Sequence, residues 1–212
     1  LQQRPAPRGG GIVRREHCCF YRVAETPQAF DFRVLSVDAA FKDSATSSYV
    51  VIQAWGRRGN KHYLLAQVRR RMTFTQTLKA TRDMRRLDYP TANACLIEDK
   101  ANGTAIIDVL RDEIPGVIAI EPIGSKEARA EAAAPLIQAG NVLLPHPDEQ
   151  PWVEMYIAEW TSVPTGAFWD QVDATDQYLL KYGRQYAVSL QAALADPPRS
   201  IANHSDAPWG MR

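Results

Sequence analysis

Two short apolar runs that each end on an acidic residue constrain the fold of this chain most strongly. Residues Phe32–Asp38 are mostly apolar and β-branched, and Ala92–Glu98 has the same form. Such runs are typical of strands buried within a sheet, where polar groups are confined to the strand ends. We therefore expect Asp38 and Glu98 to lie at the rim of a hydrophobic core, each held by a rigid strand.

The neighbouring segments predict an α/β fold with a mixed sheet of five strands flanked by helices. Phe32–Asp38, Tyr49–Trp55 and His62–Val68 are joined by short connections, which is typical of an antiparallel meander. Ala92–Glu98, a helical pattern and Val117–Ile120 then follow in the order of a parallel, right-handed crossover. Helices are expected over residues 73–88, 102–114, 125–138, 148–160 and 170–182.

The two ends of the chain lack such patterns. We expect a lead-in or linker over residues 1–30, one domain over residues 31–183, and a C-terminal helix with a flexible tail over residues 184–212. No apolar run approaches the roughly 20 residues of a membrane span, so no membrane partner is expected. The three cysteines match neither a disulfide framework nor a zinc motif.

Basic residues are concentrated between Arg57 and Arg86, where ten Lys or Arg stand against one acid, although the net charge of the whole chain is only +1. Such a block is either a solvated face or a surface that grips phosphates. Five of its members are the candidate DNA contacts: Arg69, Arg70, Arg71, Lys79 and Arg82.

A mixed sheet of this order is of the ribonuclease H type, in which the first and fourth strands lie side by side and bring Asp38 next to Glu98. Two carboxylates about 4 Å apart repel by on the order of 4 kcal/mol at an effective dielectric of about 20. Either one takes a proton or a cation lies between them. Oxygen ligands favour magnesium or manganese, and two such ions can promote phosphodiester cleavage.

Several short motifs occur together in an order that resembles the C-terminal nuclease domain of the large terminase subunit of tailed bacteriophages and prophages. The resemblance runs from about Val34 to Tyr182. The motifs are Ser36–Ala40 followed by Ser44–Tyr49, Leu96–Gly103, Ile114–Val117, Gly124–Ala130, Ala139–Pro145 and Asp170–Ala174.

The resemblance implies an endonuclease, dependent on two Mg²⁺ or Mn²⁺ ions, that cuts double-stranded concatemeric viral DNA in the cytoplasm of the bacterial host. It also implies an upstream packaging ATPase domain, a small terminase subunit and a portal as partners. The phosphate-binding loop of such an ATPase, Gly-x-x-x-x-Gly-Lys-Ser/Thr, does not occur in this sequence.

The resemblance also assigns the acids. Its first and second acids fall on Asp38 and Glu98, and its third is expected in a motif Asp-Asp-x-x-Asp, whose first position is Trp169 here. We expect Asp170 to be the third catalytic metal ligand and Asp173 to be an auxiliary one. Because they are three residues apart, a helix would present both to one site.

Purely structural roles remain possible for the residues that flank the acids. Glu98 or Asp99 could do no more than cap the next helix. Lys100 could be a surface charge or could touch the scissile phosphate. Lys126 and Arg129 could bind DNA phosphates or pair with Glu127 and Glu131. The competing functions are another ribonuclease H-like polynucleotidase, of the resolvase or transposase type, and a non-catalytic domain that docks on DNA or on packaging proteins.

Overall fold

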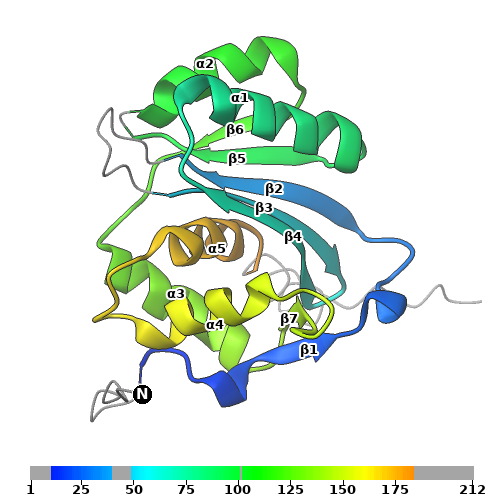
Figure 1. The fold of residues 1–212 in the computed structure, drawn as a ribbon, viewed down its shortest axis with the longest axis vertical. Helices are drawn as coiled ribbons and strands as arrows, with labels where there is room; N and C mark the ends of the chain where they lie inside the picture. The colour runs from blue at the N-terminus through cyan, green and yellow to red at the C-terminus, as the bar shows by residue number, and fades with distance from the viewer. Residues whose placement is uncertain (1–10, 40–48, 101, 184–212) are drawn as a thin grey trace, which may run out of the picture.

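One mixed sheet organises this computed structural model, which describes residues 11–39, 49–100 and 102–183 (Figure 1). The motif residues 44–48 and the expected C-terminal helix and tail lie outside the described residues. The strands are β1 (Cys19–Tyr21), β2 (Phe32–Asp38), β3 (Val50–Arg58), β4 (Lys61–Arg70), β5 (Ala94–Glu98), β6 (Val117–Ile120) and β7 (Val142–Pro145).

The sheet confirms the ribonuclease H type of topology and extends it. The described strands lie in the order β1-β7-β4-β3-β2-β5-β6. Strands β2, β3 and β4 are antiparallel neighbours, and β5 and β6 join β2 as parallel strands, as the sequence pattern predicts. The prediction of five strands is wrong, because β7 pairs in parallel with β4 and β1 pairs in parallel with β7.

The expectation that residues 1–30 are only a lead-in is wrong for the stretch that contains β1. Val13 is buried, and the backbone N–H of Ile12 donates to the carbonyl of Val163 at 3.4 Å. The Tyr21 hydroxyl donates to the carbonyl of Leu64 at 2.9 Å. These partners are 43 residues or more away along the chain, so a local pattern gives no sign of them.

Helices cover both faces of the sheet (Figure 1). Two hydrophobic cores result, one on each face. Among the described residues, no helix is both long and apolar enough to span a bilayer. One face carries α1 (Phe74–Asp83), the π-helical η3 (Met84–Asp88) and α2 (Asn102–Glu113). The other face carries α3 (Lys126–Gln138), α4 (Trp152–Ser162) and α5 (Asp170–Tyr182). The short helices η1 (Arg15–His17) and η2 (Val23–Glu25) flank β1 along the chain.

The strand alternation decides to which face the acids point. Leu35 and Val37 belong to the core beneath α1 and α2, whereas Val34 belongs to the core beneath α3, α4 and α5. Successive side chains of a strand point to opposite faces, so Asp38 points to the face covered by α5. The same alternation along β5 directs Glu98 to this face.

Candidate functional site

Asp38 and Glu98 end two adjacent parallel strands. The register of β2 and β5 pairs Val37 with Ile97, and each acid is the next residue on its strand. Asp38 is buried, with 4% of its surface exposed, and the side chain of Glu98 is 15% exposed. The sequence predicts that the strands ending in Asp38 and Glu98 lie side by side and bring the two acids together at their carboxyl ends. The pairing of β2 with β5 confirms this prediction.

The start of α2 packs directly against the end of β5. A Cβ atom on Gly103 would lie 1.8 Å from the carbonyl oxygen of Glu98, so only glycine fits at this approach. Asp99 accepts a hydrogen bond from the Thr104 hydroxyl at 2.6 Å and thus supports the first turn of α2. Asp99 therefore ties the end of β5 to the first turn of α2, whereas Glu98 lines a pocket beside α5.

Asp170 and Asp173 lie in the first turn of α5, the helix that packs on β2 and β3 beside the two strand-end acids. Both side chains are buried. Polar side chains of the sheet fix the helix: the Ser36 hydroxyl donates to the carbonyl of Ala174 at 2.6 Å, and the Gln53 amide donates to the carbonyl of Gln171 at 3.1 Å. Four acids from three elements thus converge at one edge of the sheet.

The N-terminus of α5 is held by Glu159 of α4, a residue that the sequence pattern did not single out. Its carboxylate accepts the backbone N–H of Gln171 at 2.6 Å and the amide of the same residue at 2.7 Å. A carboxylate at this position is favoured by the helix dipole. In the sequence Glu159 is not distinguished from other acids within helices. The residue that it binds belongs to another helix, which a local pattern does not reveal.

Arg69 joins this anchor to the acidic cluster. Its guanidinium lies 3.3 Å from a Glu159 oxygen and 3.7 Å from an Asp170 oxygen, and it lies over the Tyr49 ring, 3.8 Å from the centroid. The side chain is mostly buried. Arg69 therefore orients Asp170, and its predicted contact with DNA would have to be made through the small part that solvent reaches.

Burial, with a smaller contribution from neighbouring charges, raises the pKa values of Asp38 and Asp170. Burial raises the pKa of Asp38 well above its ordinary value, and the neighbouring charges of Asp173, Glu98 and Asp170 add to this effect while Lys126 opposes it. Burial and then the charge of Glu159 raise the pKa of Asp170 to about 6, against the opposing effects of Arg69 and Lys126. The acids are thus close enough to disfavour one another's charges.

Basic side chains partly balance this negative charge. The Lys126 ammonium pairs with Asp173, and the Arg129 guanidinium lies 2.6 Å from the other oxygen of that carboxylate. Lys100 lies 3.1 Å from Glu98. Of the interpretations that the sequence left open for Lys126 and Arg129, the pairing with Glu127 and Glu131 gives way to pairing with α5.

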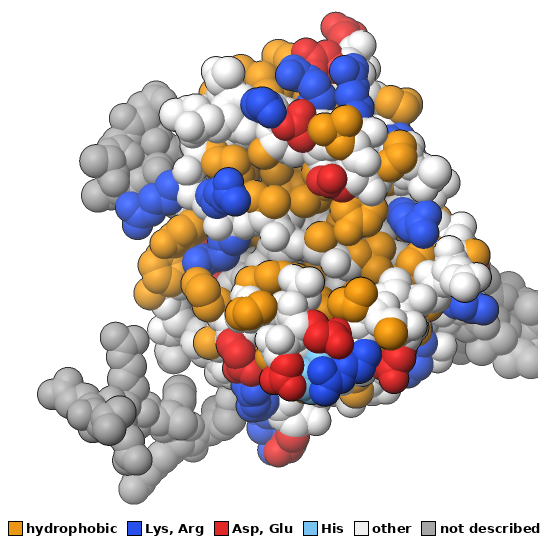
Figure 2. Space-filling view, turned by 45° about the vertical axis from the view of Figure 1, so that its right-hand side comes forward, with side chains coloured by type: hydrophobic (Ala, Val, Ile, Leu, Met, Phe, Trp, Pro, Cys, Tyr) orange, Lys and Arg blue, Asp and Glu red, His pale blue; other side chains and the backbone are white. Residues whose placement is uncertain are grey.

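The basic block of the sequence does not form one surface. Lys79 and Arg82 lie on α1, across the sheet from α5, and they pair with Asp83 and Glu113. Arg70 and Arg71 are exposed at the end of β4. On the face shown in Figure 2, Lys and Arg side chains lie in separate groups, with acidic side chains beside several of them.

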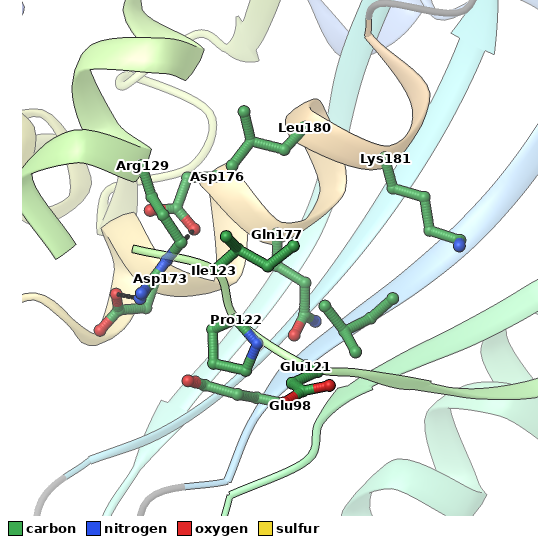
Figure 3. A pocket seen from close by; sticks show the side chains of 11 residues that line it. Glu98, Glu121, Pro122, Ile123, Arg129, Asp173, Asp176, Gln177, Leu180 and Lys181 are labelled. Atoms are coloured by element: carbon green, nitrogen blue, oxygen red, sulfur yellow. Dashed lines mark hydrogen bonds and ion pairs between the residues drawn. The ribbon is translucent and has the colours of Figure 1, made fainter. Parts of the chain in front are cut away.

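A pocket of about 220 Å³ opens beside the acids, between the ends of β5 and β6 and the helix α5 (Figure 3). Glu98 lines it from β5 and Asp173 from α5, and Glu121 follows β6. Asp176, which the sequence pattern also missed, lines the pocket with 1% of its surface exposed and no hydrogen-bond partner on either oxygen among the described residues. Arg129 lies 3.6 Å from it.

The chemistry of the cluster fits divalent cations. Carboxylate oxygens are the ligands that Mg²⁺ and Mn²⁺ prefer, and burial together with the neighbouring acids Asp173 and Glu98 disfavours the charged form of Asp38, which a bound cation would favour. Among the described residues, however, no three acidic, histidine or cysteine side chains stand close enough together to enclose an ion.

Comparisons with known proteins agree with this fold. Residues 35–181 match the family model of the terminase RNaseH-like domain. No curated protein sequence matches the chain.

Similar folds occur in large terminases of bacteriophages. The Mn-bound nuclease domain of the SPP1 large terminase has a TM-score of 0.57 at 14% identity, over 78% of this chain and 97% of that one. The Mg-bound nuclease of the thermophilic phage G20c has a TM-score of 0.60 at 12% identity, over 81% and 97%. The large terminase of another thermophilic bacteriophage has a TM-score of 0.61 at 12% identity, and the match covers 82% of this chain but only 45% of that one.

Proposed function

This chain belongs to the terminase family of RNaseH-like domains, and we propose that it is a divalent-metal-dependent endonuclease that cuts double-stranded, concatemeric viral DNA. The observation that carries the proposal is the convergence of Asp38, Glu98, Asp170 and Asp173 at one edge of the sheet. The metal-bound nuclease domains of similar fold from SPP1 and G20c support it.

In this proposal Asp38, Glu98 and Asp170 are the catalytic metal ligands, and Asp173 is an auxiliary one. Two Mg²⁺ or Mn²⁺ ions bound there would stabilise charge on the attacking and leaving oxygens of the phosphodiester. The chain itself contributes the positioning, because β2, β5 and the buried helix α5 fix the acids. Lys100, which is more than half exposed beside Glu98, would contact a phosphate of the DNA.

The remaining parts of the proposal concern the larger assembly. The chain spans less than half the length of the longer large terminase that it resembles in fold. We propose that it works with a packaging ATPase domain, a small terminase subunit and a portal in the cytoplasm of the bacterial host. Besides Lys100, its DNA contacts are proposed to be Lys126, Arg129, Arg69, Arg70, Arg71, Lys79 and Arg82.

A plasmid-nicking assay in Mn²⁺ tests the enzymatic proposal. The wild-type chain should convert supercoiled plasmid to nicked and linear forms, and Asp38→Asn should reduce the rate by about a hundredfold or more. Even a residue that only orients a metal ligand costs about 10–100-fold when it is changed. Calorimetric titration with Mn²⁺ should show weaker binding to the same variant.

Asp108→Asn is the matched control, since Asp108 is an exposed acid on α2, on the far side of the sheet from α5. It should cut plasmid and bind Mn²⁺ like the wild type. Wild-type protein that binds the plasmid and leaves it intact in both Mg²⁺ and Mn²⁺ would instead identify a non-catalytic docking domain.

A further inference from the structure

Both oxygens of Asp173 already pair with basic groups, so a divalent cation that approaches either oxygen meets a positive charge. One carboxylate oxygen pairs with the Lys126 ammonium, and the other lies 2.6 Å from the Arg129 guanidinium. The carboxylate itself is nearly inaccessible, with 2% of the side chain exposed. Access of a cation to Asp173 therefore depends on which of the two basic groups can leave.

The two basic groups differ in their freedom to move. The Arg129 side chain is 7% exposed and also faces Asp176, 3.6 Å away, so it is fixed between two acids. The Lys126 side chain is 51% exposed and stands in the first turn of α3, after the Ser125 cap. A lysine ammonium on its flexible stem can swing into water more easily than a buried guanidinium.

Lys126 also faces more of the cluster than Asp173 alone. Besides pairing with Asp173, its ammonium interacts electrostatically with Asp38 and Glu98. It also interacts electrostatically with Asp170. One ammonium therefore acts electrostatically on four carboxylates, as a bound cation would.

We propose that Lys126 is a built-in counter-ion, which neutralises the acidic cluster when no metal is bound and must leave Asp173 when divalent cations enter. This inference rests on the proposed metal site. It makes Lys126 a competitor of the metal rather than a helper, and it assigns the residue a second position, away from Asp173, in the metal-bound protein. The freed ammonium then points to solvent, where a DNA phosphate can reach it.

The substitution Lys126→Met separates competition from simple support, because the two roles predict opposite changes in metal affinity. Without the ammonium, Mn²⁺ should bind more tightly in calorimetric titration, within the roughly 5–150-fold range typical of coupling between two sites. The metal-free variant should melt at a lower temperature than the wild type, since the acids lose their counter-ion. Lys126→Arg, which keeps the charge, should bind Mn²⁺ no more tightly than the wild type.

Lys61→Met is the matched control, because it removes the same charge from the start of β4, at the opposite end of that strand from Arg69 and the acids. Its Mn²⁺ affinity should equal that of the wild type. Equal or weaker Mn²⁺ binding by Lys126→Met would overturn the inference while leaving the metal site intact. Absence of Mn²⁺ binding by the wild type would instead overturn the proposed function, and this inference with it.

A measurement on the wild type covers the case in which Lys126→Met does not fold. The ammonium resonance of Lys126, assigned by its loss in Lys126→Arg, should report an ordered, hydrogen-bonded group without metal and a mobile one at saturating Mg²⁺. An ammonium that stays ordered while Mg²⁺ binds would overturn the inference.

Discussion

His62 is a buried histidine of β4 that contacts α5 from the sheet. Its Nδ1 lies 2.9 Å from the Tyr178 hydroxyl, and 1% of the residue is exposed. Burial, together with the positive charge of Arg57, lowers the pKa of His62 to about 4. The ring is therefore neutral in the folded protein at neutral pH.

This residue should make stability depend on pH in mildly acidic solution. The unfolded chain takes up a proton on His62 near pH 6.5, whereas the folded protein does so only near pH 4. The contribution of neutral His62 to the free energy of unfolding is therefore complete above pH 6.5. It decreases by about 3 kcal/mol in total as the pH falls from 6.5 to 4. Denaturant unfolding of wild type and His62→Gln across this range should show the difference between them shrinking by that amount. A difference in the free energy of unfolding that stays constant with pH would contradict the lowered pKa of His62.

Single residues also differ in how far the sequence predicts them. Asp38 and Glu98 could be found because each ends an apolar run, and the strand fixes the direction of each side chain. Glu159 and Asp176 could not, because each lies inside a helical pattern and gains its role only from the packing of α4 and α3 against α5. The partners of a charge are set by tertiary structure, which a local pattern does not contain.

At the level of elements, α5 is the part on which the site depends. Its bounds, Asp170–Tyr182, agree with the helix expected from the sequence. Its first ten residues are buried, which an amphipathic pattern would not indicate. The helix is held at its N-terminus by Glu159 and Arg69, so these two residues should support the position of Asp170 as well as the stability of the protein.

Glu159→Gln tests this anchor. The variant keeps the size of the side chain but removes the charge that Arg69 and the start of α5 share, so the free energy of unfolding should fall by about 1–3 kcal/mol. Glu154→Gln is the matched control on the same helix: Glu154 is exposed and pairs with Arg15, and loss of a surface ion pair should change the free energy of unfolding much less. Urea denaturation measures both. An equal loss in the two variants would mean that Glu159 is no more than another surface charge.

At the scale of the whole molecule, the sequence predicts the strands β2 to β6 better than the two strands β1 and β7 at one edge of the sheet. Strands β2 to β6 carry runs with clear alternation or continuous apolar character, and all five are found in the expected order. The added strands β1 and β7 have three and four residues, and no local pattern shows that they join this sheet. Their pairing joins Cys19 with Leu143, so it depends on contacts that only the folded chain brings about.

The edge of the sheet provides the last prediction, which concerns the boundary of the domain. A chain that begins at residue 31 loses β1, the buried side chains of Val13 and Tyr21, and the hydrogen bond from the Tyr21 hydroxyl to Leu64. Burial of a large apolar side chain contributes about 1.5–3 kcal/mol, so the truncated chain should be less stable by about 3 kcal/mol or more. It should also aggregate more readily, because the edge of β7 is left unpaired. A chain that begins at residue 11 is the control in thermal and urea unfolding, since it keeps every residue named here. Equal stability of the two chains would restore the view that residues 11–30 only lead into the domain, and would limit the folded unit to residues 31–183.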